Sequence, residues 1–81
     1  MKIFYFGAPW CGQCKTLKPK VEEECKTRGI ALQIVDVEEE DGLCDIYGIK
    51  NVPTIILVKN GEIVARASGG GAWDEVRKHI V

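Results

Sequence analysis

The feature that most constrains this chain is a pair of cysteines, Cys11 and Cys14, that separates two different sequence patterns. An uninterrupted apolar stretch, residues 3–6, precedes the pair and favours a strand buried on both faces. Behind the pair, apolar residues recur every four positions, as on one face of a helix: Leu17, Val21 and Cys25. Residues three apart at a helix start lie on the same side, so the two sulfurs come within disulfide range. This context predicts a redox dithiol.

The position of Cys11 at the start of a helix has a chemical consequence. Unpaired backbone N–H groups and the positive end of the helix dipole both favour a thiolate over a thiol there. The thiolate is the nucleophile in thiol chemistry. We therefore expect the pKa of Cys11 to lie below the value of a free thiol.

Composition limits the classes of protein that this chain can be. Its 81 residues, 46% of them hydrophobic, predict a single globular domain spanning residues 1–81. A net charge of −1 gives no general attraction to nucleic acid or to an anionic membrane. No apolar run approaches the roughly 18 residues of a membrane span, and the N-terminal apolar stretch is too short for a signal peptide. We expect a cytoplasmic protein in a reducing setting, in which two structural disulfides are the weaker interpretation of the four cysteines.

Hydrophobic periodicity and turn residues predict seven elements in the order β-α-β-α-β-β-α. Asn60-Gly61 between two apolar runs indicates a hairpin. In the short second helix, Leu43, Ile46 and Tyr47 are expected to face inward. Tyr5 is expected to pack in the core and His79 to be exposed. The predicted elements span residues 2–7, 11 or 12–28, 31–37, 40–47, 54–59, 62–67 and 72–79.

Several motifs together resemble the thioredoxin family. They are Trp10-Cys11-Gly12-Gln13-Cys14-Lys15, Pro19, Val52-Pro53-Thr54, Lys59-Asn60-Gly61-Glu62 and Gly69, in order along nearly the whole chain. Gln13 stands where that family usually has proline. The chain is shorter than an ordinary thioredoxin and is expected to begin at the central strand. The resemblance implies an α/β thioredoxin fold in its minimal form: a four-stranded mixed sheet in the order 2-1-3-4, flanked by three helices. It also implies a cis bond between Val52 and Pro53.

The same resemblance implies a thiol-disulfide oxidoreductase. Cys11, as the more exposed sulfur, would attack a substrate disulfide, and the more buried Cys14 would then resolve the mixed disulfide. The redox-active Cys11–Cys14 disulfide would need no metal or other cofactor. Disulfide-containing proteins would be the substrates, a thioredoxin reductase-like protein or glutathione the electron donor, and the protein a monomer. The substrate-binding residues would be Trp10, Gly12, Gln13, Val52, Pro53, Ser68 and Gly69.

Three alternatives remain open at this point. Small size and Gly70-Gly71 with Asp74 loosely favour a glutaredoxin-like, glutathione-linked enzyme, whereas the Trp-Cys-Gly-x-Cys-Lys motif favours thioredoxin. A zinc or iron–sulfur site would need Cys25 and Cys44 as further ligands, but structural zinc sites usually use two close cysteine pairs. Cys25 also falls on the apolar helix stripe, where a free cysteine behaves as a small hydrophobe. A redox-inactive binding domain is disfavoured by the presence of both cysteines of the pair.

Overall fold

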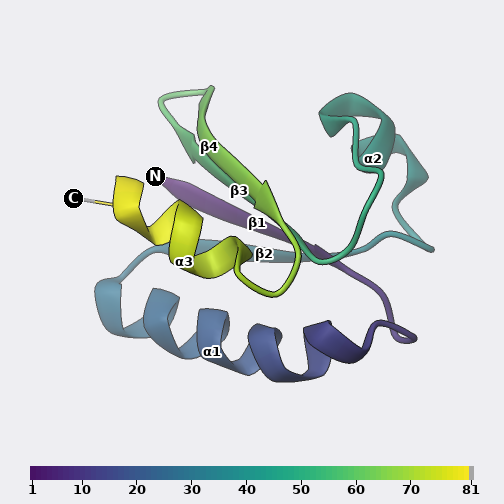
Figure 1. Cartoon of the computed structure of the whole chain (residues 1–81). Helices are drawn as coiled ribbons and strands as arrows, with labels where there is room; N and C mark the ends of the chain where they lie inside the picture. Colours follow the sequence, from purple (N-terminus) through teal and green to yellow (C-terminus); the bar gives the residue numbers. More distant parts are fainter. Residues whose placement is uncertain (81) are drawn as a thin grey trace.

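The computed structural model describes residues 1–80 and confirms the predicted order of elements (Figure 1). Val81 lies outside the described residues. The second strand and second helix are each one residue shorter than predicted, the fourth strand is one residue longer, and the last helix ends in a 3₁₀ turn, η1. The elements are β1 (Lys2–Gly7), α1 (Gly12–Arg28), β2 (Ala31–Asp36), α2 (Asp41–Tyr47), β3 (Thr54–Lys59), β4 (Glu62–Ser68), α3 (Ala72–Val76) and η1 (Arg77–His79).

The four strands form one mixed sheet in the order β2-β1-β3-β4, as predicted. β1 pairs in parallel with β2 and antiparallel with β3, and β3 pairs antiparallel with β4. The hairpin between β3 and β4 turns at Asn60 and Gly61, which both adopt positive φ values of 53° and 79°. Two successive positive φ values are the requirement of a type I′ turn, and Asn-Gly meets it.

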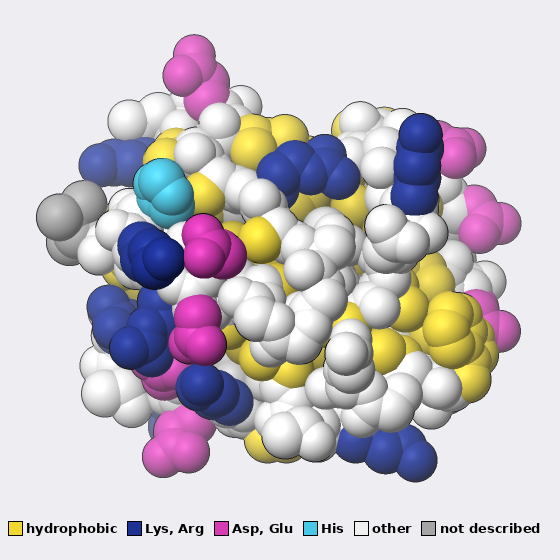
Figure 2. Space-filling model, viewed as in Figure 1, with side chains coloured by type: hydrophobic (Ala, Val, Ile, Leu, Met, Phe, Trp, Pro, Cys, Tyr) yellow, Lys and Arg dark blue, Asp and Glu magenta, His cyan; other side chains and the backbone are white. Residues whose placement is uncertain are grey.

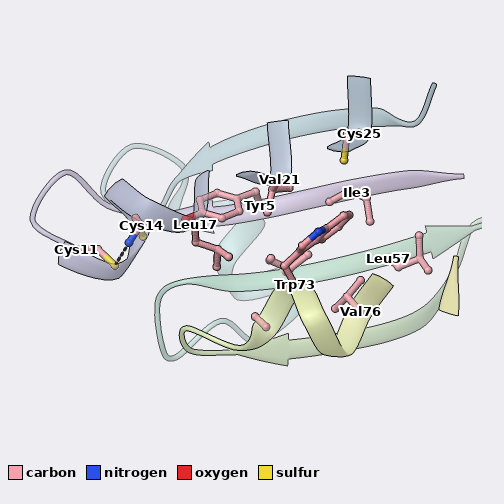
Figure 3. Packing of buried hydrophobic residues seen from close by; sticks show 12 residues of the cluster. Ile3, Tyr5, Cys11, Cys14, Leu17, Val21, Cys25, Leu57, Trp73 and Val76 are labelled. Atoms are coloured by element: carbon pink, nitrogen blue, oxygen red, sulfur yellow. Dashed lines mark hydrogen bonds between the residues drawn. The ribbon is translucent and has the colours of Figure 1, made fainter. Parts of the chain in front are cut away.

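Alternation along β1 divides the core into two clusters, one on each face of the sheet. Ile3 and Tyr5 belong to the larger cluster, to which α1 and α3 contribute, whereas Phe4 and Phe6 belong to the smaller one beneath α2. In Figure 1, α1 and α3 lie below the strands and α2 lies apart from them at the upper right. Figure 3 shows the larger cluster, which runs from the cysteine pair to the opposite end of the sheet.

A carboxylate joins the two helices that cover the larger cluster. Trp73 of α3 is fully buried, and its indole N–H donates a hydrogen bond to Glu24 of α1. The other oxygen of Glu24 lies 3.4 Å from Arg77 and 3.8 Å from Arg28. Glu24 therefore satisfies a buried donor and also accepts two surface ion pairs, which fixes α3 against α1.

The predicted inward face of α2 is wrong at one position. Ile46 is 76% exposed, whereas Leu43, Cys44 and Tyr47 pack against the smaller cluster. The Tyr47 ring lies 5.3 Å from the Phe4 ring, centre to centre, and this contact fixes the face that the helix presents. A seven-residue helix touches the sheet along a narrow edge, and Ile46 lies outside it. Within residues 1–80, no helix is long and apolar enough to cross a membrane.

Candidate active site

The cysteine pair lies at the connection between β1 and α1, which is the longest helix of the described residues. β1 ends at Gly7, and the chain turns through Ala8 before Cys11 caps α1. The Cys11 N–H donates to the Ala8 carbonyl over 3.1 Å, which closes this turn. The Cys11 sulfur accepts a hydrogen bond from the Cys14 N–H at 3.3 Å, so the side chain takes the place of an ordinary polar N-cap. Both cysteines are free thiols, so the structure represents the reduced dithiol.

The expected difference in exposure between the two cysteines is absent. Cys11 and Cys14 are each 6% exposed, so Cys11 is not the more exposed residue. The physical reason is the capping bond, which holds the Cys11 side chain back over the helix end instead of outward. The two thiols differ in their surroundings instead, because Cys14 lines an inner pocket with Tyr5.

The expected direction of the Cys11 pKa is also wrong. Burial raises the pKa of the Cys11 thiol, and the neighbouring Cys14 thiol raises it further. The backbone N–H groups of Cys14 and Gln13 oppose this by favouring the thiolate. The sequence argument counted only the helix terminus, because neither the burial of Cys11 nor its contact with a second thiol can be deduced from the spacing.

A groove of about 350 Å³ is lined by Trp10, which directly precedes Cys11, and by Val52. Trp10 is 68% exposed, the largest apolar side chain left so open to solvent among the described residues. Four residues that the sequence analysis did not select also line this groove: Val37, Ile49, Lys50 and Asn51. Residues 49–51 directly precede Val52-Pro53, so their position beside the predicted loop was the signal that could have found them, whereas Val37 carried no such signal. Figure 2 shows hydrophobic side chains gathered on the side of the molecule where α1 begins.

The other predicted residues form a second margin of the site. The Val52–Pro53 bond is cis, and the Pro53 carbonyl accepts a hydrogen bond from the Gly69 N–H at 2.9 Å. The Ser68 and Thr54 hydroxyls lie 2.9 Å apart at the ends of β4 and β3. This pairing places the loop before β3 beside the loop after β4.

The side chain of Gln13 reaches the same loop. A Cβ added to Gly70 would lie only 3.5 Å from Gln13 Nε2, so the amide rests against the glycine. Gly12 and Gln13 are both exposed at the first turn of α1. Trp10 and Val52 therefore line the same groove, and Pro53 and Gly69 are joined by a backbone hydrogen bond. Gln13 contacts the β4–α3 loop from the same helix turn that carries the cysteine pair.

The remaining cysteines do not extend the site. Cys25 is 1% exposed in the larger cluster, and Cys44 packs against the smaller cluster on the opposite face of the sheet. Burial raises the pKa of the Cys25 thiol, which makes it a poor ligand or nucleophile at neutral pH. Among residues 1–80, no three His, Cys, Asp or Glu side chains are grouped so that they could hold a metal ion.

Comparison with known proteins agrees with this geometry. The sequence matches the thioredoxin family over residues 1–81. The chain belongs to the thioredoxin family. It is 40% identical over 80 residues to thioredoxin-1 of Caenorhabditis elegans, a match that covers 98% of this chain and 69% of that protein. It is 41% identical over 66 residues to thioredoxin of Bacillus subtilis, covering 79% of this chain and 64% of that protein.

Structural and multidomain relatives extend the comparison. The fold superposes on thioredoxin 1 of Thermosipho africanus with a TM-score of 0.88 and 28% identity, covering 96% of this chain and 88% of that one. A protein disulfide-isomerase of Aspergillus oryzae is 35% identical over 79 residues, which cover 94% of this chain but 15% of that protein. This thioredoxin-family chain thus spans only part of the relatives it matches.

Proposed function

We propose that this thioredoxin-family protein is a thiol-disulfide oxidoreductase that reduces disulfide bonds in other proteins. The observation that carries the proposal is the free Cys11–Cys14 pair at the N-terminus of α1, where the Cys11 sulfur accepts a backbone N–H. That bond favours the charged form of the sulfur, which is the attacking form. The dithiol supplies the electrons, so the reaction as proposed uses no further cofactor.

The proposed reaction begins at Cys11. Its thiolate attacks one sulfur of a substrate disulfide, a new Cys11–substrate bond forms, and the other substrate sulfur leaves as a thiolate. Cys14 then loses its proton and attacks the Cys11 sulfur. This breaks the mixed disulfide, releases the second substrate thiolate and leaves a Cys11–Cys14 disulfide. Two electrons have passed to the substrate, whose thiolates take up protons from water.

The surroundings of the pair support an extended peptide as substrate. Trp10, which directly precedes Cys11, and Val52 line a mainly apolar groove that is large enough for one side chain. Ser68, Gly69 and Pro53 lie together where the loop before β3 meets the loop after β4. Gly12 and Gln13 are exposed at the first turn of α1, and the Gln13 amide rests against Gly70 of the loop after β4. We assign substrate contact to these residues and chemistry to the two cysteines.

A thiol electron donor must restore the reduced pair after each cycle. The names of the relatives favour a thioredoxin reductase-like donor over glutathione, since the similar proteins are thioredoxins and protein disulfide-isomerases. The test compares two regenerating systems, NADPH with a thioredoxin reductase and glutathione with its reductase, each with the same disulfide-bonded protein substrate. Turnover with the first system and little with the second is expected. Faster turnover with glutathione would replace the proposal by the glutaredoxin-like alternative.

A further inference from the structure

One buried polar group in the larger cluster has no partner. Tyr5 of β1 is 1% exposed, and its hydroxyl makes no hydrogen bond within residues 1–80. A buried hydroxyl left unpaired lowers stability, and most buried polar side-chain atoms have a partner. The sequence analysis assigned Tyr5 to packing alone, but packing would be served equally well by phenylalanine. The hydroxyl therefore calls for a separate explanation.

The Tyr5 ring and the Cys14 sulfur both lie next to Gly7. A Cβ placed on Gly7 would lie 2.9 Å from Tyr5 Cε1 and 3.1 Å from Cys14 Sγ. Figure 3 shows the Tyr5 ring extending toward the cysteine end of the cluster. Burial raises the pKa of Tyr5, and the neighbouring Cys14 side chain raises it further. The hydroxyl consequently keeps its proton over the whole range in which thiols titrate, and it can act only as a neutral donor or acceptor.

A pocket connects this pair to the surface. It has a volume of about 300 Å³, and Tyr5, Gly7 and Cys14 form part of its lining. Two charged residues, Lys18 of α1 and Asp36 of β2, also line it. A pocket of this size has room for water, and the Lys18 and Asp36 side chains can form hydrogen bonds with it. A proton that leaves Cys14 can therefore pass to solvent without crossing the apolar core.

We propose that the Tyr5 hydroxyl donates a hydrogen bond to the Cys14 sulfur when that sulfur becomes negatively charged, which makes Tyr5 a catalytic residue of the resolving step. A thiolate is a much stronger acceptor than a thiol, since hydrogen bonds to charged groups are about twice as strong as neutral ones. The hydroxyl is thus unpaired in the resting dithiol and gains its partner as charge forms. The proposal rests on the Cys11–Cys14 exchange chemistry described above.

The charge on Cys14 arises in both directions of the cycle. When a mixed disulfide is resolved, Cys14 gives its proton to water in the pocket and its sulfur attacks Cys11, expelling the substrate thiolate. When the protein is reduced again, a donor thiolate attacks Cys11 and breaks the Cys11–Cys14 bond, and Cys14 leaves as a thiolate. In each case Tyr5 stabilises the charged sulfur without giving up its own proton.

A single-turnover experiment isolates the resolving step. Cys11 is loaded with a coloured aromatic thiol as a mixed disulfide at low pH, and release of that thiol is followed after a jump to each of a series of pH values. In Tyr5→Phe, release at neutral pH should be about tenfold to a hundredfold slower, the range expected for a hydrogen bond to a charged group. The pH profile of release should also move to higher pH. Thermal stability should not fall, because the hydroxyl removed has no partner in the resting protein.

Two controls separate this inference from the proposed function. Cys14→Ser should release no thiol, and failure of the wild-type protein to release it would overturn the dithiol mechanism itself. Tyr47→Phe removes the hydroxyl of a tyrosine packed on the other face of the sheet and should leave the profile unchanged. A Tyr5→Phe profile that superimposes on the wild-type profile would overturn the role of the hydroxyl.

A second substitution covers the case in which Tyr5→Phe disturbs folding. Fluorotyrosine introduced into the Tyr47→Phe protein labels Tyr5 alone, since the chain holds two tyrosines. The fluorinated ring keeps its shape, and its hydroxyl is a stronger donor. Release should then be faster at neutral pH, with the profile moved to lower pH. An unchanged profile would contradict the proposal.

Discussion

Replacing Glu24 by alanine should destabilise the protein mainly through the loss of one hydrogen bond. The fully buried Trp73 indole donates to Glu24, and no other acceptor for this N–H is seen within residues 1–80. A buried donor left unsatisfied costs about 1–3 kcal/mol. The ion pairs of Glu24 with Arg77 and Arg28 join side chains that are 26–43% exposed, and such pairs contribute about 0–1 kcal/mol. The expected loss for Glu24→Ala is therefore about 2 kcal/mol.

The matched variant Glu24→Gln keeps an acceptor oxygen for Trp73 and removes only the charge. It should cost less than about 1 kcal/mol, the value of the surface ion pairs. Urea unfolding of the reduced protein, followed by far-UV circular dichroism, measures both free energies. In a domain of this size, a loss of about 2 kcal/mol also lowers Tm by about 8–16 °C.

A double-mutant cycle tests whether the loss of stability in Glu24→Ala comes from the hydrogen bond with Trp73. In a Trp73→Phe background the donor is absent, so adding Glu24→Ala should cost less than about 1 kcal/mol. Equal losses for Glu24→Ala and Glu24→Gln in the wild-type background would refute the reasoning, because they would mean that charge, not the buried donor, carries the stability. So would an Ala variant within about 0.5 kcal/mol of wild type, the ordinary range for a surface substitution.

Three further predictions follow from the contacts around the cysteines. Cys14→Ala removes the thiol that raises the pKa of Cys11 and keeps the backbone N–H that favours the thiolate. Alkylation of Cys11 at neutral pH, measured by mass spectrometry, should therefore be faster than in wild type, and an equal or slower rate would contradict this. Because the pKa of Cys25 is raised above its ordinary value of 9.0, the unfolded chain loses this proton first as pH rises. The free energy of unfolding should thus be intact below about pH 9 and fall above it, and this fall should be shallower in Cys25→Ala than in wild type. Gly7→Ala should lower the free energy of unfolding in urea by about 1–3 kcal/mol, because its Cβ would lie 3.1 Å from Cys14 Sγ. Gly12→Ala, whose Cβ would have nothing within 4 Å, should leave that free energy unchanged. Equal values for the two variants would show that the site around Gly7 relaxes freely.

The sequence was sufficient where local rules decide the structure. Asn60-Gly61 specifies a type I′ turn, and Gly29 ends α1 in the left-handed conformation with φ 69°. The alternation along β1 places consecutive side chains on opposite faces of the sheet. Long, strongly periodic elements such as α1 were therefore predicted with the correct ends, and the resemblance to thioredoxins supplied the strand order.

The sequence was insufficient where distant segments determine the environment. Ile46 and Cys44 both lie on α2, and only the aromatic contacts with β1 decide which of them faces the sheet. The hydrogen bond from the Cys14 N–H holds the Cys11 side chain over the helix end. The resulting burial raises the pKa of Cys11, whereas the helix terminus alone would lower it. The Tyr5 hydroxyl is unpaired because of how the folded core surrounds it, with Cys14 of α1 near the ring, and the sequence pattern does not show this environment.

Trapping of a mixed disulfide tests the central claim most directly. The Cys14→Ser protein, reduced and then mixed with a disulfide-bonded protein, should form a stable covalent adduct through Cys11, because the resolving thiol is absent. Intact-mass and peptide mass spectrometry identify the adduct and the cysteine that carries it. The Cys11→Ser protein should form no such adduct in the same time, and wild type should accumulate the Cys11–Cys14 disulfide instead. An adduct that forms through Cys14 in Cys11→Ser, with none through Cys11 in Cys14→Ser, would contradict the account.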